Sequence, residues 1–264
     1  MRVNVTGAGG FIGRHLVPAL VQAGHEMHST LSGAQAVVHL AGIAHRRATS
    51  EELQQVNVRL TERIARESAG AGARMVFLSS VKVHGEESTH PLTESSPLAP
   101  ADDYARSKAQ AEAALRSISN LQLVVVRPPL VYRPHVKANF LALMKPIGRG
   151  IPLPLASIQN RRSLVYVGNL ADAILRCIAD PRAVGRTYLI SDGMALSTPA
   201  LCRAIGGALG RPARLFPFPP RLLPGPLSRS LEVDDRALRT ELGWRAPFSL
   251  EEGLRATADW YRSR

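Results

Sequence analysis

Residues 2–13 read Arg-Val-Asn-Val-Thr-Gly-Ala-Gly-Gly-Phe-Ile-Gly, and this stretch decides the fold. A short strand pattern passes directly into a glycine-rich turn, and a helical pattern follows at 11–23. Gly7, Gly10 and Gly13 allow a tight turn, a close approach of the backbone to a phosphate group, and packing of the helix on the strand. The helix N-terminus then faces the anion. The order predicts a dinucleotide-binding unit, and a glycine-rich turn without a ligand is the weaker alternative.

The alternation of strand-like and helix-like runs after this unit predicts an α/β fold. Strand patterns lie at 36–40, 74–79 and 121–127, and helical patterns lie at 51–70, 102–119, 137–148, 169–180, 198–209, 234–242 and 249–262. We expect a Rossmann-type, doubly wound parallel sheet with helices on both faces and a smaller C-terminal substrate-binding part. The expected domains are 1–130, which binds the dinucleotide, and 131–264, which mainly binds the substrate. Residues 163–180 are expected to return to the first domain.

The segment between the second predicted strand and the third is short. A second strand near 25–29 would end at the top of the sheet, yet the strand that begins at Ala36 must start at the bottom. A parallel crossover normally takes about a dozen residues or more. We therefore expect a truncated or displaced second strand, and we expect the strand and helix that usually lie beyond it to be missing.

The composition argues against several classes of function. The chain has 264 residues, of which 45% are hydrophobic and 20% charged, as in an ordinary globular protein. Its formal charge is +12, but the arginines are scattered and form no basic cluster interleaved with aromatic residues, which argues against nucleic-acid binding. No apolar run is long enough to predict a membrane span, and Met1 leads straight into the first strand, so we expect a cytoplasmic protein. Cys177 and Cys202 lack metal-ligand spacing, and we expect no bound metal.

Two polar motifs follow the glycine turn. Ser79 and Ser80 come at the end of a strand pattern, and Tyr104 stands four residues before Lys108 on a helical segment. Residues four apart share a helix face, so the Lys108 ammonium can lie near the Tyr104 phenol and lower its pKa from about 10. Tyr104 is therefore a candidate general base for a hydroxyl group, and a general acid in the reverse direction. An exposed pair on an alanine-rich helix is the alternative.

Together, these motifs resemble the extended short-chain dehydrogenase/reductase family, and more closely its nucleotide-sugar epimerase and dehydratase branch. Further matching segments are Val56-Asn57, Arg127-Pro128, Val165-Tyr166-Val167-Gly168-Asn169-Leu170, Leu242-Gly243-Trp244 and Trp260-Tyr261. The resemblance implies NAD as the cofactor, with NADP as the alternative, and a UDP-linked sugar as the substrate. The implied cofactor-binding residues are Gly7, Gly10, Phe11, Ile12, Gly13, Leu40, Ala41, Gly42, Tyr104 and Lys108. The implied catalytic residues are Ser80, Tyr104, Lys108 and Asn57, and the implied substrate-binding residues are Ser80, Lys82, Asn139 and Arg162.

The resemblance also implies individual roles. Ser80, rather than Ser79, is expected to hold the reacting oxygen, because its distance from the following glycine matches the catalytic Ser or Thr of the family. Arg162 matches an arginine that binds the diphosphate in relatives that use UDP-sugars, and Arg161 is its alternative. Asn139 resembles a residue that caps the diphosphate at a helix start. The histidines at 39, 45 and 84 are interpreted as structural.

One departure from the family bears on the reaction. In the 4,6-dehydratases an acidic pair follows the catalytic Ser or Thr, because elimination of water requires an acid and a base. This chain has Val81 and Lys82 there, which disfavours dehydration. The leading hypothesis is a 4-epimerase of a UDP-hexose or UDP-N-acetylhexosamine. A reductase of a UDP-4-keto sugar is second, and a non-catalytic NAD(P)-binding protein of the same fold is third.

A second departure concerns the cofactor. Residues 28–34 offer neither the acidic residue that would bind the adenosine ribose nor an arginine for a 2′-phosphate. NAD is expected from the resemblance alone, and we expect an open adenosine side and a weaker affinity than usual. The resemblance also implies a homodimer formed through the helices at 51–70 and 102–119.

Overall fold

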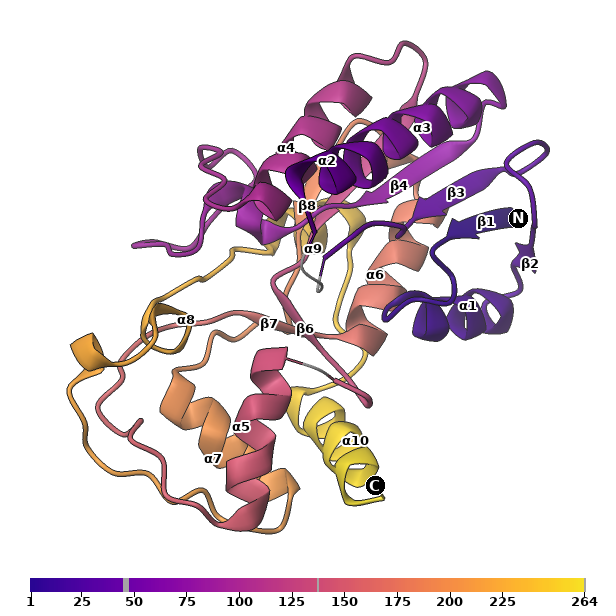
Figure 1. Ribbon diagram of the computed structural model, residues 1–264. Coiled ribbons are helices and arrows are strands. Elements are labelled where there is room, and N and C mark those ends of the chain that lie inside the picture. Colours follow the sequence, from indigo (N-terminus) through magenta and orange to yellow (C-terminus); the bar gives the residue numbers. More distant parts are fainter. Residues whose placement is uncertain (45–47, 137, 264) are drawn as a thin grey trace.

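The computed structural model describes residues 1–44, 48–136 and 138–263, and it confirms the doubly wound α/β fold (Figure 1). The main sheet has six strands in the order β2-β1-β3-β4-β5-β8, and all neighbouring strands are parallel. These strands are β1 (Arg2–Thr6), β2 (Glu26–Met27), β3 (Ala36–His39), β4 (Arg74–Leu78), β5 (Gln122–Arg127) and β8 (Thr187–Leu189). The central strands are buried on both faces, which explains their nearly continuous apolar sequences.

Helices cover both faces of this sheet (Figure 1). One face carries α1 (Gly13–Gln22) and α6 (Val167–Ala179), which pack against each other. The other face carries α4 (Asp103–Arg116) and a continuous helical run, whose parts are α2 (Ser50–Leu53), a π-helical turn (Gln54–Arg59) and α3 (Leu60–Gly70). The predicted helix at 51–70 is therefore present, with a π-helical turn inside it.

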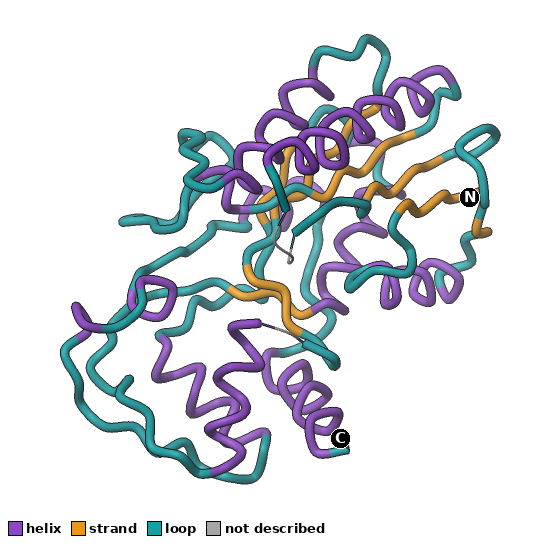
Figure 2. The backbone as a smooth tube through the Cα atoms, in the orientation of Figure 1, coloured by secondary structure: helices purple, strands orange, loops and turns teal. Residues whose placement is uncertain are grey.

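The second part of the molecule packs below the sheet around its own apolar core (Figure 1). Its elements are the two-stranded sheet β6 (Leu130–Tyr132) and β7 (Leu164–Tyr166), the helices α5 (Ala138–Arg149), α7 (Thr198–Ala208) and α10 (Leu250–Arg262), and the short helix α8 (Gly225–Ser228). Figure 2 shows long loops between these helices, as the many prolines of this half predict. After residue 130 the chain returns to the first part twice. The first return brings α6 against α1 and β8 beside β5, and the second brings α9 (Arg236–Leu242) against β8.

The truncated second strand is confirmed. β2 has two residues, which pair with Arg2 and Val3, so it ends beside the first half of β1. The chain stays there, because His28 N–H donates to Val3 O at 2.9 Å and Arg2 Nε donates to Gly33 O at 2.8 Å. It then enters β3 on the other side of β1 without an intervening helix. In the part of the chain that the structure describes, no strand lies beyond β2.

Among the described residues, no helix is both long and apolar enough to cross a membrane.

Candidate active site

The glycine turn joins β1 to α1 at the carboxyl edge of the sheet and packs on the segment after β3. Gly7 has a φ of +77°, and a Cβ atom on it would lie 2.8 Å from the backbone nitrogen of Ala41. A Cβ atom on Gly13 would overlap the carbonyl oxygen of Ala8. The first turn of α1 contains no acidic residue, and Ile12 at its N-cap makes no side-chain hydrogen bond. This helix N-terminus can therefore receive an anionic group.

Two predicted catalytic residues meet beside this turn. A Cβ atom on Gly42 would lie 3.0 Å from Asn57 Oδ1 and 3.5 Å from Lys108 Nζ, so both side chains reach the same point after β3. Lys108 Nζ donates to the Leu78 carbonyl at 2.8 Å and lies 4.6 Å from the ring centroid of Phe77. The ends of β3 and β4 and the buried face of α4 thus converge on one place.

Asn57 is fully buried in the π-helical turn. Its Oδ1 accepts from the Ile43 N–H at 2.7 Å, and its Nδ2 donates to Ile43 O at 3.0 Å and to Ser107 Oγ at 2.9 Å. These bonds connect the loop after β3 to α4. Asn57 therefore holds the backbone next to Lys108 in position, and π-helical turns of this kind often occur at functional sites.

Tyr104 and Ser80 face each other where β4 ends. The Ser80 side chain lies close enough to Tyr104 to favour its ionised form, and Ser80 Oγ accepts from the Lys82 N–H at 3.2 Å at the start of the 3₁₀ turn Val81–His84. The neighbouring Ser79 instead donates to Glu112 Oε1 at 2.5 Å. Ser80 is thus the serine next to Tyr104, and its catalytic role stays a prediction.

The pKa of Tyr104 differs from the sequence-based expectation. Burial raises it, and the Ser80 side chain and the charge of Lys82 oppose this rise without cancelling it. Lys82 is itself held by Asp102 Oδ2 at 2.7 Å and Glu86 Oε1 at 3.1 Å. Burial also lowers the pKa of Lys108 to about 8, against the pull of the Glu112 carboxylate. The expectation of a lowered Tyr104 pKa was wrong because it left out the cost of burying a charge.

The two arginines of the second half occupy different environments. Arg161 is at the surface and forms an ion pair with Glu232 at 2.6 Å. Arg162 is half-buried, donates to Arg229 O at 3.0 Å, and lies within electrostatic reach of Glu86. Arg162 is thus the arginine that lies near the loop after Ser80. The side chain of Asn139 lies outside the described part of the structure, as does His45.

Comparisons with known proteins identify the family. The model of the NAD-dependent epimerase/dehydratase family matches residues 29–191. The chain is 33% identical to a UDP-glucose 4-epimerase of Vibrio cholerae over 97% of its own length and 94% of that protein. The chain belongs to this family.

One further relative and one solved structure of similar fold extend over the whole chain. A UDP-glucose 4-epimerase of Mycolicibacterium smegmatis is 30% identical over 100% of this chain and 99% of that protein. A short-chain dehydrogenase/reductase superfamily structure from Agrobacterium tumefaciens with bound NAD has a TM-score of 0.83 at 20% identity and covers 100% and 98% of the two chains. The Vibrio alignment runs over 308 positions, so that relative has residues that this chain of 264 lacks. A missing outer strand–helix unit predicts such a difference in length.

The first part of the site fits the NAD cofactor on which the family depends. The glycine turn lies open above Gly9, where no atom would lie within 4 Å of an added Cβ, and the uncapped start of α1 is beside it. Leu40 and Ala41 pack on the same turn from the end of β3, and Lys108 lies next to Gly42, which follows them. The fit is poorer at the adenosine end, because 28–35 lies beside the first half of β1.

A buried polar network supports the catalytic loop and was not found from the sequence. Arg127 donates to both carboxylate oxygens of Glu112, at 2.9 and 2.5 Å, and to His84 Nε2 at 2.9 Å. His84 Nδ1 then donates to Pro97 O at 3.1 Å. The network joins β5, α4 and the loop 85–100 to Ser79. One signal was available, since Glu112 stands four residues after Lys108 on the same face of a helix rich in alanine.

His39 is structural, as predicted, and it links the glycine turn to the π-helical turn. Its Nδ1 lies 2.6 Å from Thr6 Oγ1, and its Nε2 lies 2.8 Å from Thr61 Oγ1. Thr61 donates its own proton to Asn57 O at 2.8 Å, so His39 Nε2 must carry the hydrogen and Nδ1 must accept. Burial lowers the pKa of His39 to about 3 and keeps the ring neutral.

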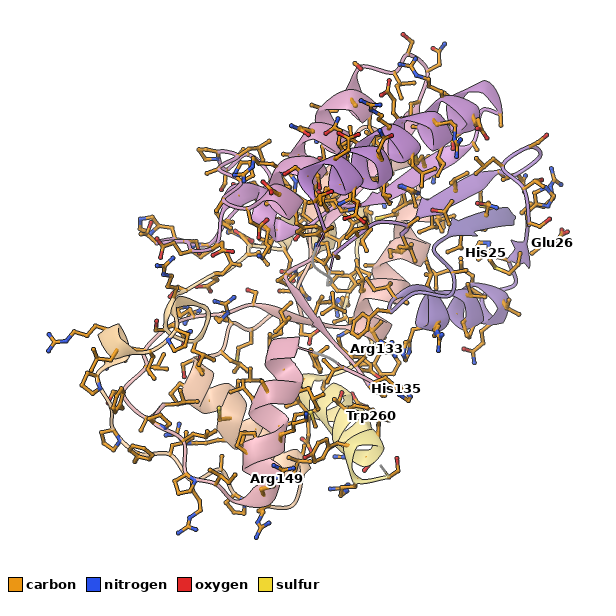
Figure 3. The ribbon with its side chains drawn as sticks, viewed as in Figure 1. His25, Glu26, Arg133, His135, Arg149 and Trp260 are labelled. Atoms are coloured by element: carbon orange, nitrogen blue, oxygen red, sulfur yellow. The ribbon has the colours of Figure 1, made fainter. Side chains whose placement is uncertain are left out.

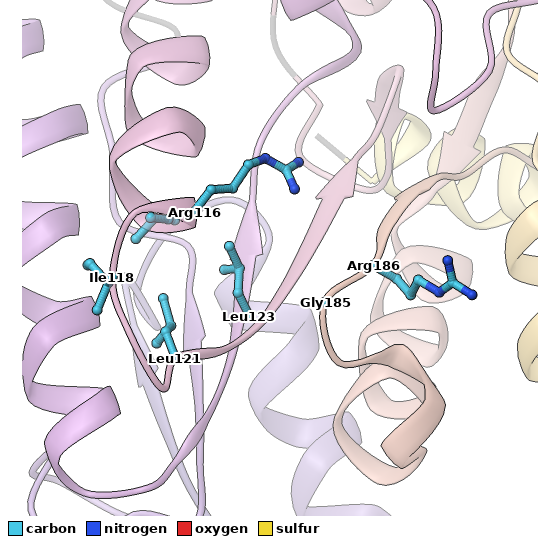
Figure 4. A pocket seen from close by; sticks show the side chains of 7 residues that line it. Arg116, Ile118, Leu121, Leu123, Gly185 and Arg186 are labelled. Carbon is cyan, nitrogen blue, oxygen red and sulfur yellow. The ribbon is translucent and has the colours of Figure 1, made fainter.

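The hollow in Figure 4 is separate from this site. It has a volume of about 200 Å³ and lies at the amino ends of β5 and β8, where its lining residues are Leu115, Arg116, Ile118, Leu121, Leu123, Gly185 and Arg186. Ligands of open α/β sheets bind at the carboxyl ends of the strands. No group of metal-ligating side chains occurs among the residues that the structure describes.

Proposed function

We propose that this chain is an NAD(P)-dependent enzyme that epimerises a UDP-linked hexose or N-acetylhexosamine at C4 by transient oxidation. The observation that carries the proposal is the proximity of Ser80 to Tyr104 at the carboxyl edge of β4, together with Lys108 of the same helix, which reaches the Leu78 carbonyl and Gly42. Family membership and two UDP-glucose 4-epimerases among its relatives support the substrate class.

The side chains have complementary roles in this reaction. Tyr104 takes the proton of the C4 hydroxyl and returns it after the sugar has presented its other face. Ser80 holds the reacting oxygen, and the charge of Lys82 favours the ionised phenol. The nicotinamide, when bound, supplies the hydride acceptor. Asn57 positions the loop next to Lys108 and does not touch the reacting atoms.

The diphosphate of the substrate is assigned to Arg162. A guanidinium group suits bidentate contact with phosphate, and Arg162 has no carboxylate within ion-pair distance among the described residues. Asn139 remains a second proposed ligand at the start of α5. Dehydration is not proposed, because Val81 and Lys82 supply no acid–base pair next to Ser80.

Reduction of a UDP-4-keto sugar is the alternative, and one observation favours it. β2 ends beside Val3, so the adenosine half of the cofactor loses the contacts that a full second strand would provide. A weakly held cofactor exchanges with each turnover, as a reductase requires, whereas an epimerase must keep its reduced cofactor until the hydride returns.

One experiment tests the proposal. Purified protein is denatured and the released nucleotide is identified by chromatography and mass, and native protein is incubated with UDP-glucose, UDP-galactose and their N-acetyl analogues. Bound NAD(H) and interconversion of 4-epimers would support the epimerase. No bound nucleotide, with NADPH-dependent loss of a UDP-4-keto sugar, would establish the reductase instead. Binding of NAD(P) without either reaction would make the chain a non-catalytic member of the fold.

A further inference from the structure

Arg133 is a buried cation next to the glycine turn. It follows β6 directly, it is 6% exposed, and its guanidinium carbon lies 4.0 Å from the ring centroid of Phe11. Phe11 belongs to the turn, and its ring packs on the apolar core of the second part. Figure 3 shows Arg133 where the second part meets α1. The side chain therefore reaches the cofactor turn from the second part of the molecule.

The hydrogen bonds of Arg133 leave its charge without a counterion. Its Nη1 donates to Pro134 O at 2.8 Å and to His15 Nε2 at 3.1 Å, and both acceptors are neutral. Its Nε is buried and has no acceptor among the described residues, and no carboxylate there lies within ion-pair distance. A guanidinium group stays protonated in proteins. A buried charge without a partner costs several kcal/mol, so the arrangement points to an anion that arrives with a ligand.

The neighbours of Arg133 add positive charge. Arg14 lies close enough to lower the pKa of Arg133, and Arg133 and His135 together lower the pKa of His15, although burial is the larger cause in both cases. His15 Nε2 accepts the hydrogen bond from Arg133, so this ring nitrogen carries no proton. All these groups surround the first turn of α1, whose N-terminus favours negative charge.

The backbone around Arg133 is held in place. The Val136 N–H donates to Arg133 O at 3.1 Å and closes a tight turn, and His135 in this turn has a φ of +65°. The His135 ring packs 5.0 Å from that of Trp260 on α10. A left-handed backbone at a histidine is uncommon. The fold therefore fixes the backbone of the turn 133–136 before any ligand binds.

We propose that Arg133 binds the pyrophosphate of the dinucleotide, from the side of the turn opposite to β3. This contact would replace part of the affinity that the truncated β2 forfeits at the adenosine end. The proposal concerns only the cofactor and does not depend on which sugar is epimerised or reduced.

The test measures binding without any sugar nucleotide. Affinities for NAD and ADP-ribose are determined by calorimetry at 50 and 200 mM NaCl for the wild type, Arg133→Leu and Arg133→Lys. Because a hydrogen bond to a charged group contributes about 1.5–3 kcal/mol, we expect Arg133→Leu to bind both ligands about 10- to 100-fold more weakly. We also expect it to lose part of the salt dependence, while Arg133→Lys recovers part of the affinity. Arg149→Leu, at the exposed end of α5, is the matched control and should bind like the wild type (Figure 3).

Thermal unfolding without cofactor separates this role from a structural one. An anion ligand predicts an unchanged or higher unfolding temperature for Arg133→Leu, because the variant removes an unpaired buried charge. A lower unfolding temperature together with unchanged affinity would overturn the proposal and leave Arg133 as a packing residue. Equal affinities in the wild type and Arg133→Leu, or no binding of either ligand to the wild type, would also overturn it. Failure of the epimerase assay would leave this result unaffected, because no sugar is present.

Discussion

Two regions of the main sheet differ in how well they are built into the fold. The proposed catalytic edge is formed by the carboxyl ends of β3 and β4, and the adenosine edge is formed by β2 and the segment 28–35. At the catalytic edge, β3 and β4 are buried on both faces, and their ends carry the backbone next to Gly42 and Ser80. At the adenosine edge, β2 is a two-residue strand that only β1 supports. Loss of an outer unit removes contacts that few other elements share, whereas loss of β3 or β4 would remove the core of the sheet. The fold can therefore be shorter at β2 without disturbing the ends of β3 and β4, which carry the proposed catalytic residues.

The largest expected effect lies at the catalytic edge. Replacement of Tyr104 by Phe removes the proton acceptor, and general acid–base catalysis contributes about 10²–10⁴-fold. We expect turnover with the true substrate to fall by at least about 10²-fold, while the affinity for NAD changes little. Tyr261→Phe, on the last helix, is the control. Near-normal turnover of Tyr104→Phe would remove the basis for the proposed reaction and for the contrast between the edges.

The second effect concerns stability at the same edge. Glu112→Gln leaves Arg127 buried beside an uncharged partner, and breaking a buried pair costs about 3–5 kcal/mol. The side chains of the pair are 2% and 4% exposed, so solvent screens the loss very little. Urea unfolding measures the change. Glu62→Gln breaks an exposed pair with Arg66 and should cost less than about 1 kcal/mol. Similar losses in the two variants would show that the Glu112 network does not brace the catalytic loop.

The third effect is a pH dependence of the free energy of unfolding that arises from His39. Its pKa in the folded protein is about 3, below the unfolded value of about 6.5, so the unfolded chain binds the proton first as the pH falls. The free energy of unfolding should therefore decrease by about 1.4 kcal/mol per pH unit between pH 6.5 and 3 from this group alone. His39→Gln should show a shallower decrease than the wild type in urea titrations at several pH values. Equal slopes would mean that His39 is not held neutral, and the exposed His90→Gln serves as the control.

The smallest effect is expected at the adenosine edge. The hydrogen bonds between 28–35 and β1 involve Arg2, Val3 and Asn4, and the segment contains no acidic residue and no arginine, so we expect it not to distinguish a ribose hydroxyl from a 2′-phosphate. We expect the affinities for NAD and NADP, measured by calorimetry, to differ by less than about threefold, which is below 1 kcal/mol. A strong preference for either cofactor would show that residues outside 28–35 contact the ribose and distinguish its hydroxyl from a 2′-phosphate.

Much of the site was predictable because it depends on short-range order. The spacing of Gly7, Gly10 and Gly13 between a strand and a helix specifies the turn, and the four-residue spacing of Tyr104 and Lys108 places both on one face of α4. The short segment before Ala36 predicted the truncated β2 from chain length alone, because a parallel crossover needs more residues than are present. Predictions from residue spacing and segment length need no knowledge of long-range packing.

The sequence by itself determined the parallel α/β architecture and the truncated second strand, since periodicity and chain length specify them, and its local motifs supplied the proposed catalytic residues. Only the tertiary structure decided the pKa values, the ion pairs and the position of the buried cation. Burial raises the pKa of Tyr104, Glu112 and Arg127 pair from different elements, and Arg133 reaches the glycine turn across the seam between the two parts. Desolvation and ion pairing depend on which distant residues surround a group, and that information exists only once the chain has folded.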